Sequence, residues 1–145
     1  MSKFWKFLRL PRQRRAVLAE AAYALTWSQV QLKARPFREV AKAMGRETGA
    51  YAQEGDAATL DEARELARAV KTAARALPTG ALCLAKALAL RKMLDRRGIP
   101  AACVIGVRAS ASPDDLDAHA WVEVAGEIII GGARSRGYSR LVTYV

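Results

Sequence analysis

A cysteine and a histidine are the two residues of this chain whose types could do covalent chemistry together. Cys83 stands at the start of a segment of helical character, and His119, the only histidine, stands in a segment with strand alternation. Backbone N–H groups and the dipole at a helix start favour the thiolate form of cysteine. An imidazole within reach could take the thiol proton and later deliver it to a leaving amine. The pair therefore predicts acyl chemistry of the cysteine-peptidase or acyl-transferase kind.

Each residue also has a purely structural interpretation. Cys83 could be a small apolar side chain on a packed helix face, and a lone histidine is often a hydrogen-bonded structural residue. Cys103 lies within an apolar segment, so we expect it to be buried and inert, without a disulfide to Cys83. One histidine and two unclustered cysteines do not supply the ligands of a zinc site, so we expect neither a metal nor a cofactor.

The predicted strand around His119 has two faces. One face carries His119, Trp121 and Glu123, and the other carries Ala120, Val122 and Val124. We expect the second set to face the core, and Trp121 to pack there or to line a substrate groove, with packing the stronger expectation. Glu123 lies about 13 Å from His119 along an extended strand, which is too far to orient the imidazole. We expect it to pair with a basic residue instead.

The elements that must position the pair begin with helices. Apolar residues at helical spacing predict a helix over residues 11–34, ended by the Arg-Pro pair at 35–36, and a short helix over 37–44 before Gly45. Residues 46–58 have the composition of a loop. Thr59 and Glu62 form a capping-box pattern at the start of the next helix, which the Pro-Thr-Gly sequence at 78–80 ends.

The second half of the chain predicts one more helix and then strands. The helix covers residues 81–97, and Gly98 is placed to end it in a left-handed conformation. Strands are predicted over 102–107, 119–124, 127–130 and 141–145, with a hairpin turn at Ala125-Gly126 and a polar loop over 108–117. The expected fold class is α+β, with N-terminal helices packed on a small antiparallel sheet.

Length and composition suit one globular domain. The chain has 145 residues, of which 52% are hydrophobic, enough to fill a core. No apolar run approaches the roughly 18–20 residues that span a bilayer. The basic N-terminal segment lacks the apolar stretch and cleavage site of a signal peptide, so we expect a cytoplasmic protein.

The formal net charge of +10 favours acidic partners, such as an acidic peptide, nucleic acid or an anionic membrane surface. A basic surface that only keeps the protein soluble is an equal alternative. The sequence contains no aromatic-and-basic ribonucleoprotein motif, no zinc-finger spacing and no helix-turn-helix pattern. We therefore expect no nucleic-acid partner, and contact with a membrane surface is the weaker alternative.

In combination, several motifs resemble the lasso-peptide leader peptidases, which are transglutaminase-like cysteine proteases. The matching residues cover about a third of the chain: 82–84 and 87–90 around the cysteine, 96–101, 104–108, the sequence Ala-His-Ala-Trp-Val-Glu-Val at 118–124, and Gly126. The resemblance implies a single domain over 1–145, with an N-terminal helical part over 1–58 and a transglutaminase-like or papain-like core over 59–145.

The resemblance also implies a function. Cys83 would be the nucleophile and His119 the base of a peptidase that removes the leader from a ribosomally synthesised lasso-peptide precursor. The implied partners are the precursor leader peptide, a small leader-binding partner protein, and a lasso cyclase that uses ATP and receives the core peptide.

One feature departs from the family. Its third catalytic residue, an aspartate on the strand after the histidine strand, has no counterpart here, because a turn at 125–126 places His119 opposite Gly132 and residues 129–133 hold no carboxylate. The nearby acids precede the predicted strand and are not clean substitutes: Asp114, Asp115 and Asp117. A backbone carbonyl, a water or a loop residue could orient His119, or the two residues could act as a dyad.

Two other classes of function remain open. An inactive transglutaminase-like scaffold that binds a peptide or a partner protein would fit the missing acid. A module that binds nucleic acid or a membrane surface would fit the net charge and the Lys-Phe-Trp-Lys-Phe-Leu-Arg segment at residues 3–9.

Overall fold

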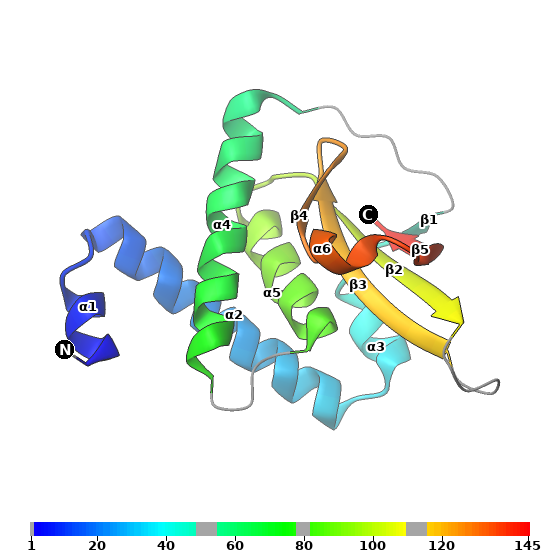
Figure 1. Cartoon of the computed structure of the whole chain (residues 1–145), viewed down its shortest axis with the longest axis horizontal. Coiled ribbons are helices and arrows are strands. Elements are labelled where there is room, and N and C mark those ends of the chain that lie inside the picture. The colour runs from blue at the N-terminus through cyan, green and yellow to red at the C-terminus, as the bar shows by residue number, and fades with distance from the viewer. Residues whose placement is uncertain (1, 49–54, 78–81, 110–115) are drawn as a thin grey trace.

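The computed structural model describes residues 2–48, 55–77, 82–109 and 116–145. The long helices gather on one side of the molecule and a twisted sheet lies on the other (Figure 1). The helices are α1 (Lys3–Leu8), α2 (Arg12–Ala34), α3 (Phe37–Lys42), α4 (Ala57–Ala76), α5 (Cys83–Arg96) and α6 (Gly132–Ser135). The strands are β1 (Glu47–Thr48), β2 (Ala102–Ala109), β3 (Leu116–Val124), β4 (Glu127–Ile130) and β5 (Ser139–Tyr144).

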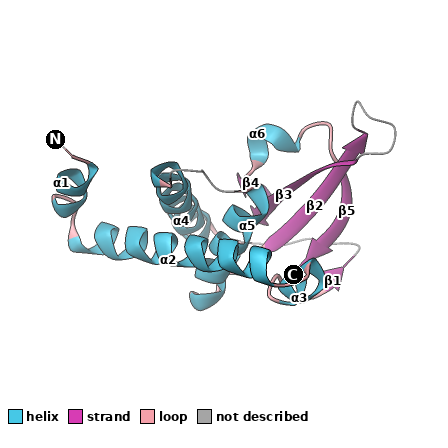
Figure 2. Ribbon diagram, turned by 90° about the horizontal axis from the view of Figure 1, so that it is seen from below, coloured by secondary structure: helices cyan, strands magenta, loops and turns pink. Residues whose placement is uncertain are grey.

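The five strands form one sheet in the order β1-β5-β2-β3-β4, and every neighbouring pair is antiparallel. Figure 2 shows the strands side by side, with α5 next to β3 and β4. The predicted α+β class with an antiparallel sheet is confirmed. No helix among the described residues is long and apolar enough to cross a membrane.

Helix α5 is the centre of the core. It packs against α2 and α4 on one side and against β3 on the other. A helix enclosed in this way must be apolar on most of its surface, and α5 meets this need with alanine, leucine and methionine: its buried apolar residues are Ala85, Ala87, Leu88, Ala89, Leu90, Met93 and Leu94. Its alanines have short side chains, which let neighbouring backbones approach closely.

The helix ends differ from the prediction at α4. The backbone N–H of Thr59 donates to the Asp56 side chain at 2.7 Å, so Asp56 is the N-cap and Thr59 already lies in the first turn. The predicted capping box of Thr59 and Glu62 is wrong by three positions, because aspartate is also a strong N-cap residue. The sequence that was expected to end α4, at 78–80, lies outside the described residues.

The end of α5 agrees with the prediction. Gly98 has φ +64°, and the N–H of Ile99 donates to the Leu94 carbonyl at 3.0 Å. The hairpin turn is also confirmed, since Ala125 and Gly126 both have positive φ, as a two-residue hairpin turn of this type requires.

Several elements are longer than predicted or were not predicted. Strands β2 and β3 extend into the expected polar loop, up to residue 109 and from residue 116. Helices α1 and α6 and the short strand β1 were not expected. Residues 110–115 of the predicted loop and residues 49–54 of the earlier one lie outside the described residues.

The hairpin register contains a shift that the prediction did not include. Val124 lies opposite Glu127 as predicted, but a bulge between Val122 and Glu123 places Val122 opposite Ile130, where β4 ends. The predicted pairing of His119 with Gly132 is therefore wrong. A bulge adds one residue to one strand, so every position beyond it moves by one.

Candidate active site

Cys83 is the first residue of α5, as predicted. Leu82 precedes the helix with extended dihedral angles, and the first helical hydrogen bond runs from the Lys86 N–H to the Leu82 carbonyl at 3.1 Å. The N–H groups of residues 83–85 precede that bond, and no described side chain caps this end of the helix. The thiol is partly buried against the core. Such N–H groups can stabilise a thiolate or hold the oxyanion of a tetrahedral intermediate.

Strand β3, which carries His119, packs on the core helix α5. Three of its side chains, Ala120, Val122 and Val124, belong to the core cluster that also contains α5 residues. This confirms the predicted core face. The other face is not open, because Trp121 and Glu123 are also buried, at 3% and 7% exposure. The sheet therefore has a second, smaller packed layer, which includes His119.

One backbone carbonyl holds the imidazole. His119 Nε2 lies 2.8 Å from the carbonyl oxygen of Gly131. Because a carbonyl oxygen can only accept, Nε2 must carry the hydrogen in this contact, which leaves the Nδ1 lone pair of the neutral ring available as a base. The rings of Trp121 and Tyr138 lie next to the imidazole, at centroid distances of 5.9 and 5.3 Å. The ring is thus restricted in both position and tautomer.

Gly131 suits this role through its backbone. It directly follows β4 and has φ +83°, a left-handed conformation that glycine adopts easily. A Cβ added there would lie 2.8 Å from the Ala120 carbonyl oxygen and 2.9 Å from Trp121 Cβ. Only a residue without a side chain can therefore bring its carbonyl to His119 in this way.

Two polar groups fix the aromatic neighbours of His119. The Glu123 carboxylate accepts from Trp121 Nε1 at 3.0 Å and pairs with Arg140, which confirms that Glu123 has a basic partner. The Asp117 carboxylate accepts from the Tyr138 hydroxyl at 2.7 Å and from Arg108 Nε at 2.8 Å.

The prediction placed Asp117 before the strand, but Asp117 lies within β3. The hydrogen bond from Tyr138, together with the hydrogen bond and ion pair from Arg108, holds the pKa of Asp117 below its ordinary value. Its carboxylate is therefore engaged with these two groups and supports the ring of Tyr138 beside His119. Asp114 and Asp115 lie outside the described residues.

Helix α5 and strand β3, which carry the predicted pair, are in contact, but the described side chains of Cys83 and His119 are not joined directly. Helix α5 packs on β3, but no hydrogen bond joins Cys83 to His119 in the described part of the chain. His119 shares its sheet face with Trp121, opposite the face that packs on α5. Catalytic hydrogen bonds are often long or misaligned in proteins without substrate and tighten when it binds.

Cys103 behaves as an inert residue. It is fully buried in β2 and forms no disulfide, and burial raises the pKa of its thiol to about 12. A thiol with that pKa stays protonated near neutral pH and is a poor nucleophile. The prediction that Cys103 is buried is confirmed.

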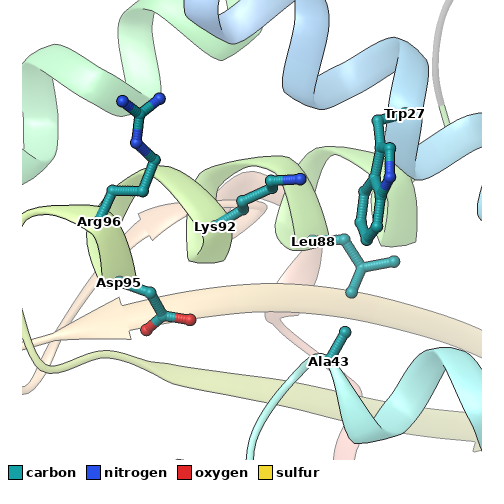
Figure 3. A pocket seen from close by; sticks show the side chains of 6 residues that line it. All are labelled: Trp27, Ala43, Leu88, Lys92, Asp95 and Arg96. Atoms are coloured by element: carbon teal, nitrogen blue, oxygen red, sulfur yellow. The ribbon is translucent and has the colours of Figure 1, made fainter.

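A separate cavity of about 390 Å³ lies between α2, α3 and α5 (Figure 3). Its wall contains the indole of Trp27, and the Lys92 ammonium lies 3.8 Å from the centroid of a Trp27 ring, a cation–π contact. Neither Cys83 nor His119 is among the described residues that line it. The cavity is therefore distinct from the candidate catalytic pair.

Sequence reasoning missed Gly131, which holds His119, and two residues around it: Tyr138, whose ring lies beside the imidazole, and Arg140, which pairs with Glu123. The Gly-Gly pair at 131–132, directly after the hairpin, was the available signal, since glycine there allows a close backbone approach. Tyr138 and Arg140 had no comparable signal, because the segment with α6 and the start of β5 bring them to this face.

Comparison with known proteins agrees with this geometry. A family model for the transglutaminase-like superfamily matches residues 27–143, which include both Cys83 and His119. Comparisons with curated proteins and with solved structures found no match. The superfamily includes cysteine peptidases, and many members are cysteine proteases or acyl transferases. The chain belongs to the transglutaminase-like superfamily.

Proposed function

We propose that this protein is a cysteine peptidase that removes the leader peptide from a ribosomally synthesised lasso-peptide precursor, acting with a leader-binding partner protein. One observation carries the catalytic part. Cys83 opens a helix that packs on the strand of the sole histidine, and the Nδ1 of that histidine is left as the basic nitrogen.

The proposed reaction uses groups of this chain only. His119 Nδ1 takes the proton of the Cys83 thiol, and the thiolate attacks the scissile carbonyl carbon. The N–H groups at the start of α5 hold the resulting oxyanion. His119 then protonates the leaving amine as the C–N bond breaks, which leaves a thioester on Cys83. Water, deprotonated by His119, attacks the thioester and releases the new carboxyl end and the free thiol.

This mechanism requires the imidazole and the thiol to approach when substrate binds. Because His119 lies on the sheet face opposite the one that packs on α5, that approach requires the imidazole or its strand to move. The base would be Nδ1, since Nε2 donates to the Gly131 carbonyl. The Gly131 carbonyl would then replace the family's aspartate in one of its two roles. It would fix the tautomer of the imidazole, but it would supply no negative charge to stabilise the imidazolium.

The substrate assignment rests on the resemblance of the matching segments to leader peptidases, and on charge. These segments are 82–84, 87–90, 96–101, 104–108, 118–124 and Gly126. A net charge of +10 suits an acidic leader or an acidic partner that carries it. We propose that the partner protein presents the leader and that a lasso cyclase receives the core peptide.

The decisive experiment is mass spectrometry of leader cleavage. The protein would be mixed with the precursor and the small leader-binding protein encoded beside it, in parallel with Cys83→Ala and His119→Ala. Cys103→Ala is the matched control, because it removes the other thiol, which is buried and protonated. We expect cleavage by the wild type and by the folded Cys103 variant, and none by the other two.

A second candidate is a catalytically inactive scaffold that binds a peptide or partner protein. The observation that favours it is the absence of a hydrogen bond between the described side chains of Cys83 and His119, with a carbonyl in place of a carboxylate at Nε2. A folded wild type that binds precursor and partner without cutting, and a Cys83→Ala variant with unchanged binding, would establish the scaffold and refute the peptidase.

A further inference from the structure

The first helix exposes large apolar side chains. None of the residues of α1 is buried, and Phe4, Trp5 and Leu8 are exposed by 67%, 58% and 42%. Scattered exposed apolar residues are ordinary, but three in one short helix form a contiguous apolar surface. In a short helix at the edge of the molecule, this surface is accessible to a partner.

The apolar and basic residues of this segment occupy opposite sides of the helix. At about 100° per residue, Phe4, Trp5, Phe7 and Leu8 fall within one arc. Lys3, Lys6 and Arg9 fall on the opposite arc. This separation defines an amphipathic helix with an aromatic face and a basic face.

The charge of the segment is not compensated nearby. The basic residues before the first acid of the chain, Glu20, are Lys3, Lys6, Arg9, Arg12, Arg14 and Arg15. Within the described residues none of these six forms an ion pair. Six unpaired cations beside an apolar face match a surface that is both anionic and apolar.

The position of α1 leaves it accessible. In both views it lies at the end of α2 that is farthest from the sheet (Figure 1, Figure 2). A surface that binds α1 would therefore contact the end of the molecule opposite the strand of His119.

We propose that α1 and the first turn of α2 bind the surface of an anionic lipid bilayer. The aromatic face would enter the headgroup region, while the lysine and arginine stems extend back to the lipid phosphates. Trp5 suits such a position, because tryptophan favours the membrane interface. Basic residues next to the apolar face add attraction to anionic lipid. The contact is reversible, since a short helix with a basic patch buries little apolar area.

The geometry favours lipid over nucleic acid. A nucleic acid would contact the basic arc and leave the aromatic arc in water, since the two arcs lie on opposite sides of the helix. A bilayer interface accommodates both arcs at once, because long basic side chains can extend past the apolar face to the headgroups. The inference does not depend on the proposed peptidase activity.

The test is co-sedimentation of the full chain with vesicles at physiological salt. One set of vesicles contains phosphatidylcholine with phosphatidylglycerol, and the other contains phosphatidylcholine alone. The apolar variant is Phe4→Ser with Leu8→Ser, and its matched control is Phe37→Ser with Leu141→Ser, at residues exposed by 45% and 66%. The charge variant is Lys3→Glu with Lys6→Glu, and its control is Lys71→Glu with Arg75→Glu on the exposed side of α4.

We expect the wild type to bind the anionic vesicles and to bind phosphatidylcholine alone much less. The lipid concentration for half-binding should rise by about tenfold or more in the apolar variant and in the charge variant, and stay unchanged in both controls. All these side chains are exposed, so equal melting temperatures would show that each variant is folded.

Three outcomes would overturn the proposal. The first is no binding of the wild type to anionic vesicles. The second is an equal loss of binding in the controls, which would indicate a diffuse charge effect. The third is an apolar variant that binds vesicles like the wild type while the charge variant loses retention on immobilised DNA. That result would assign the segment to nucleic acid.

Discussion

At the scale of single residues, the imidazole of His119 is held by a backbone group, the carbonyl of Gly131, at 2.8 Å from Nε2. Residue type and position predicted Cys83 at a helix start and His119 on a strand, and both placements are confirmed. A backbone carbonyl was one of the groups expected to orient His119, but Gly131 was not identified as its source, because the bulge beside Val122 shifts the register by one residue.

We predict that Gly131→Ala impairs cleavage through His119. The added Cβ would clash with Ala120 and Trp121 and displace the carbonyl from the imidazole. A misplacement of about 1 Å can cost roughly 10²-fold in rate, so we expect a loss of at least that order in kcat/KM. The matched control is Gly126→Ala, where φ is also positive, at +77°, but no atom lies within 4 Å of the added Cβ.

A spectroscopic measurement separates this positioning role from a general loss of stability. The chain has one histidine, so ¹⁵N-labelled histidine gives one pair of ring signals without further assignment. We expect the neutral wild type and Gly126→Ala to carry the hydrogen on Nε2, and Gly131→Ala to populate both tautomers. A wild-type ring with its hydrogen on Nδ1 would contradict the proposed base, whatever the rate of cleavage.

At the scale of elements, the periodicity of apolar residues predicted the long helices and the apolar strands. It did not predict the elements whose presence depends on tertiary contacts. Helix α2 and the strands around the hairpin were predicted because apolar spacing marks their buried sides. Helix α1 was missed because it has only six residues, none of which is buried. Strand β1 has only two residues and exists because β5 pairs with it.

The contact between α2 and the end of α5 leads to a prediction on how the stability of the fold depends on pH. The Glu20 carboxylate on α2 accepts from Arg97, just after α5, at 2.8 and 3.0 Å, and from Arg96 at 3.1 Å. The hydrogen bond from Arg97 lowers the pKa of Glu20 below its ordinary 4.5, against the opposing effect of burial. The native state therefore binds this proton less readily than the unfolded state.

We predict that Glu20→Gln lowers the free energy of unfolding by about 1–3 kcal/mol at neutral pH, as charge-assisted hydrogen bonds of partly buried groups do. The difference from the wild type should be fully present above pH 4.5 and should shrink as the pH falls through the lowered pKa of Glu20. Urea unfolding at several pH values measures it. Glu65→Gln, which removes a highly exposed partner of Arg68, should show almost no effect. A difference that does not change with pH would contradict this origin.

At the scale of the whole molecule, one arginine joins the helical layer to the sheet. Arg91 of α5 is 8% exposed and donates from Nη1 to the Ala101 carbonyl at 2.9 Å, just before β2, and to the Tyr144 carbonyl at 3.3 Å, at the end of β5. Its Nε donates to Asp95 at 2.8 Å. The contacts with Ala101 and Tyr144 join α5 to the two strand ends, so they form only when helix and sheet are both in place.

We predict that Arg91→Met destabilises the whole fold. The methionine would fill part of the volume, but two carbonyls and a carboxylate would lose a charged donor, at a cost of about 2–4 kcal/mol. Because the contacts span both layers, unfolding should stay one cooperative transition, with a lower urea midpoint and an unchanged m-value. Arg91→Lys should be destabilised less than Arg91→Met but still be less stable than the wild type, since a single ammonium group cannot reproduce the geometry of the guanidinium. Arg68→Met, at an exposed position, is the control. An early separate transition in Arg91→Met would instead indicate that the sheet can unfold while the helices remain packed.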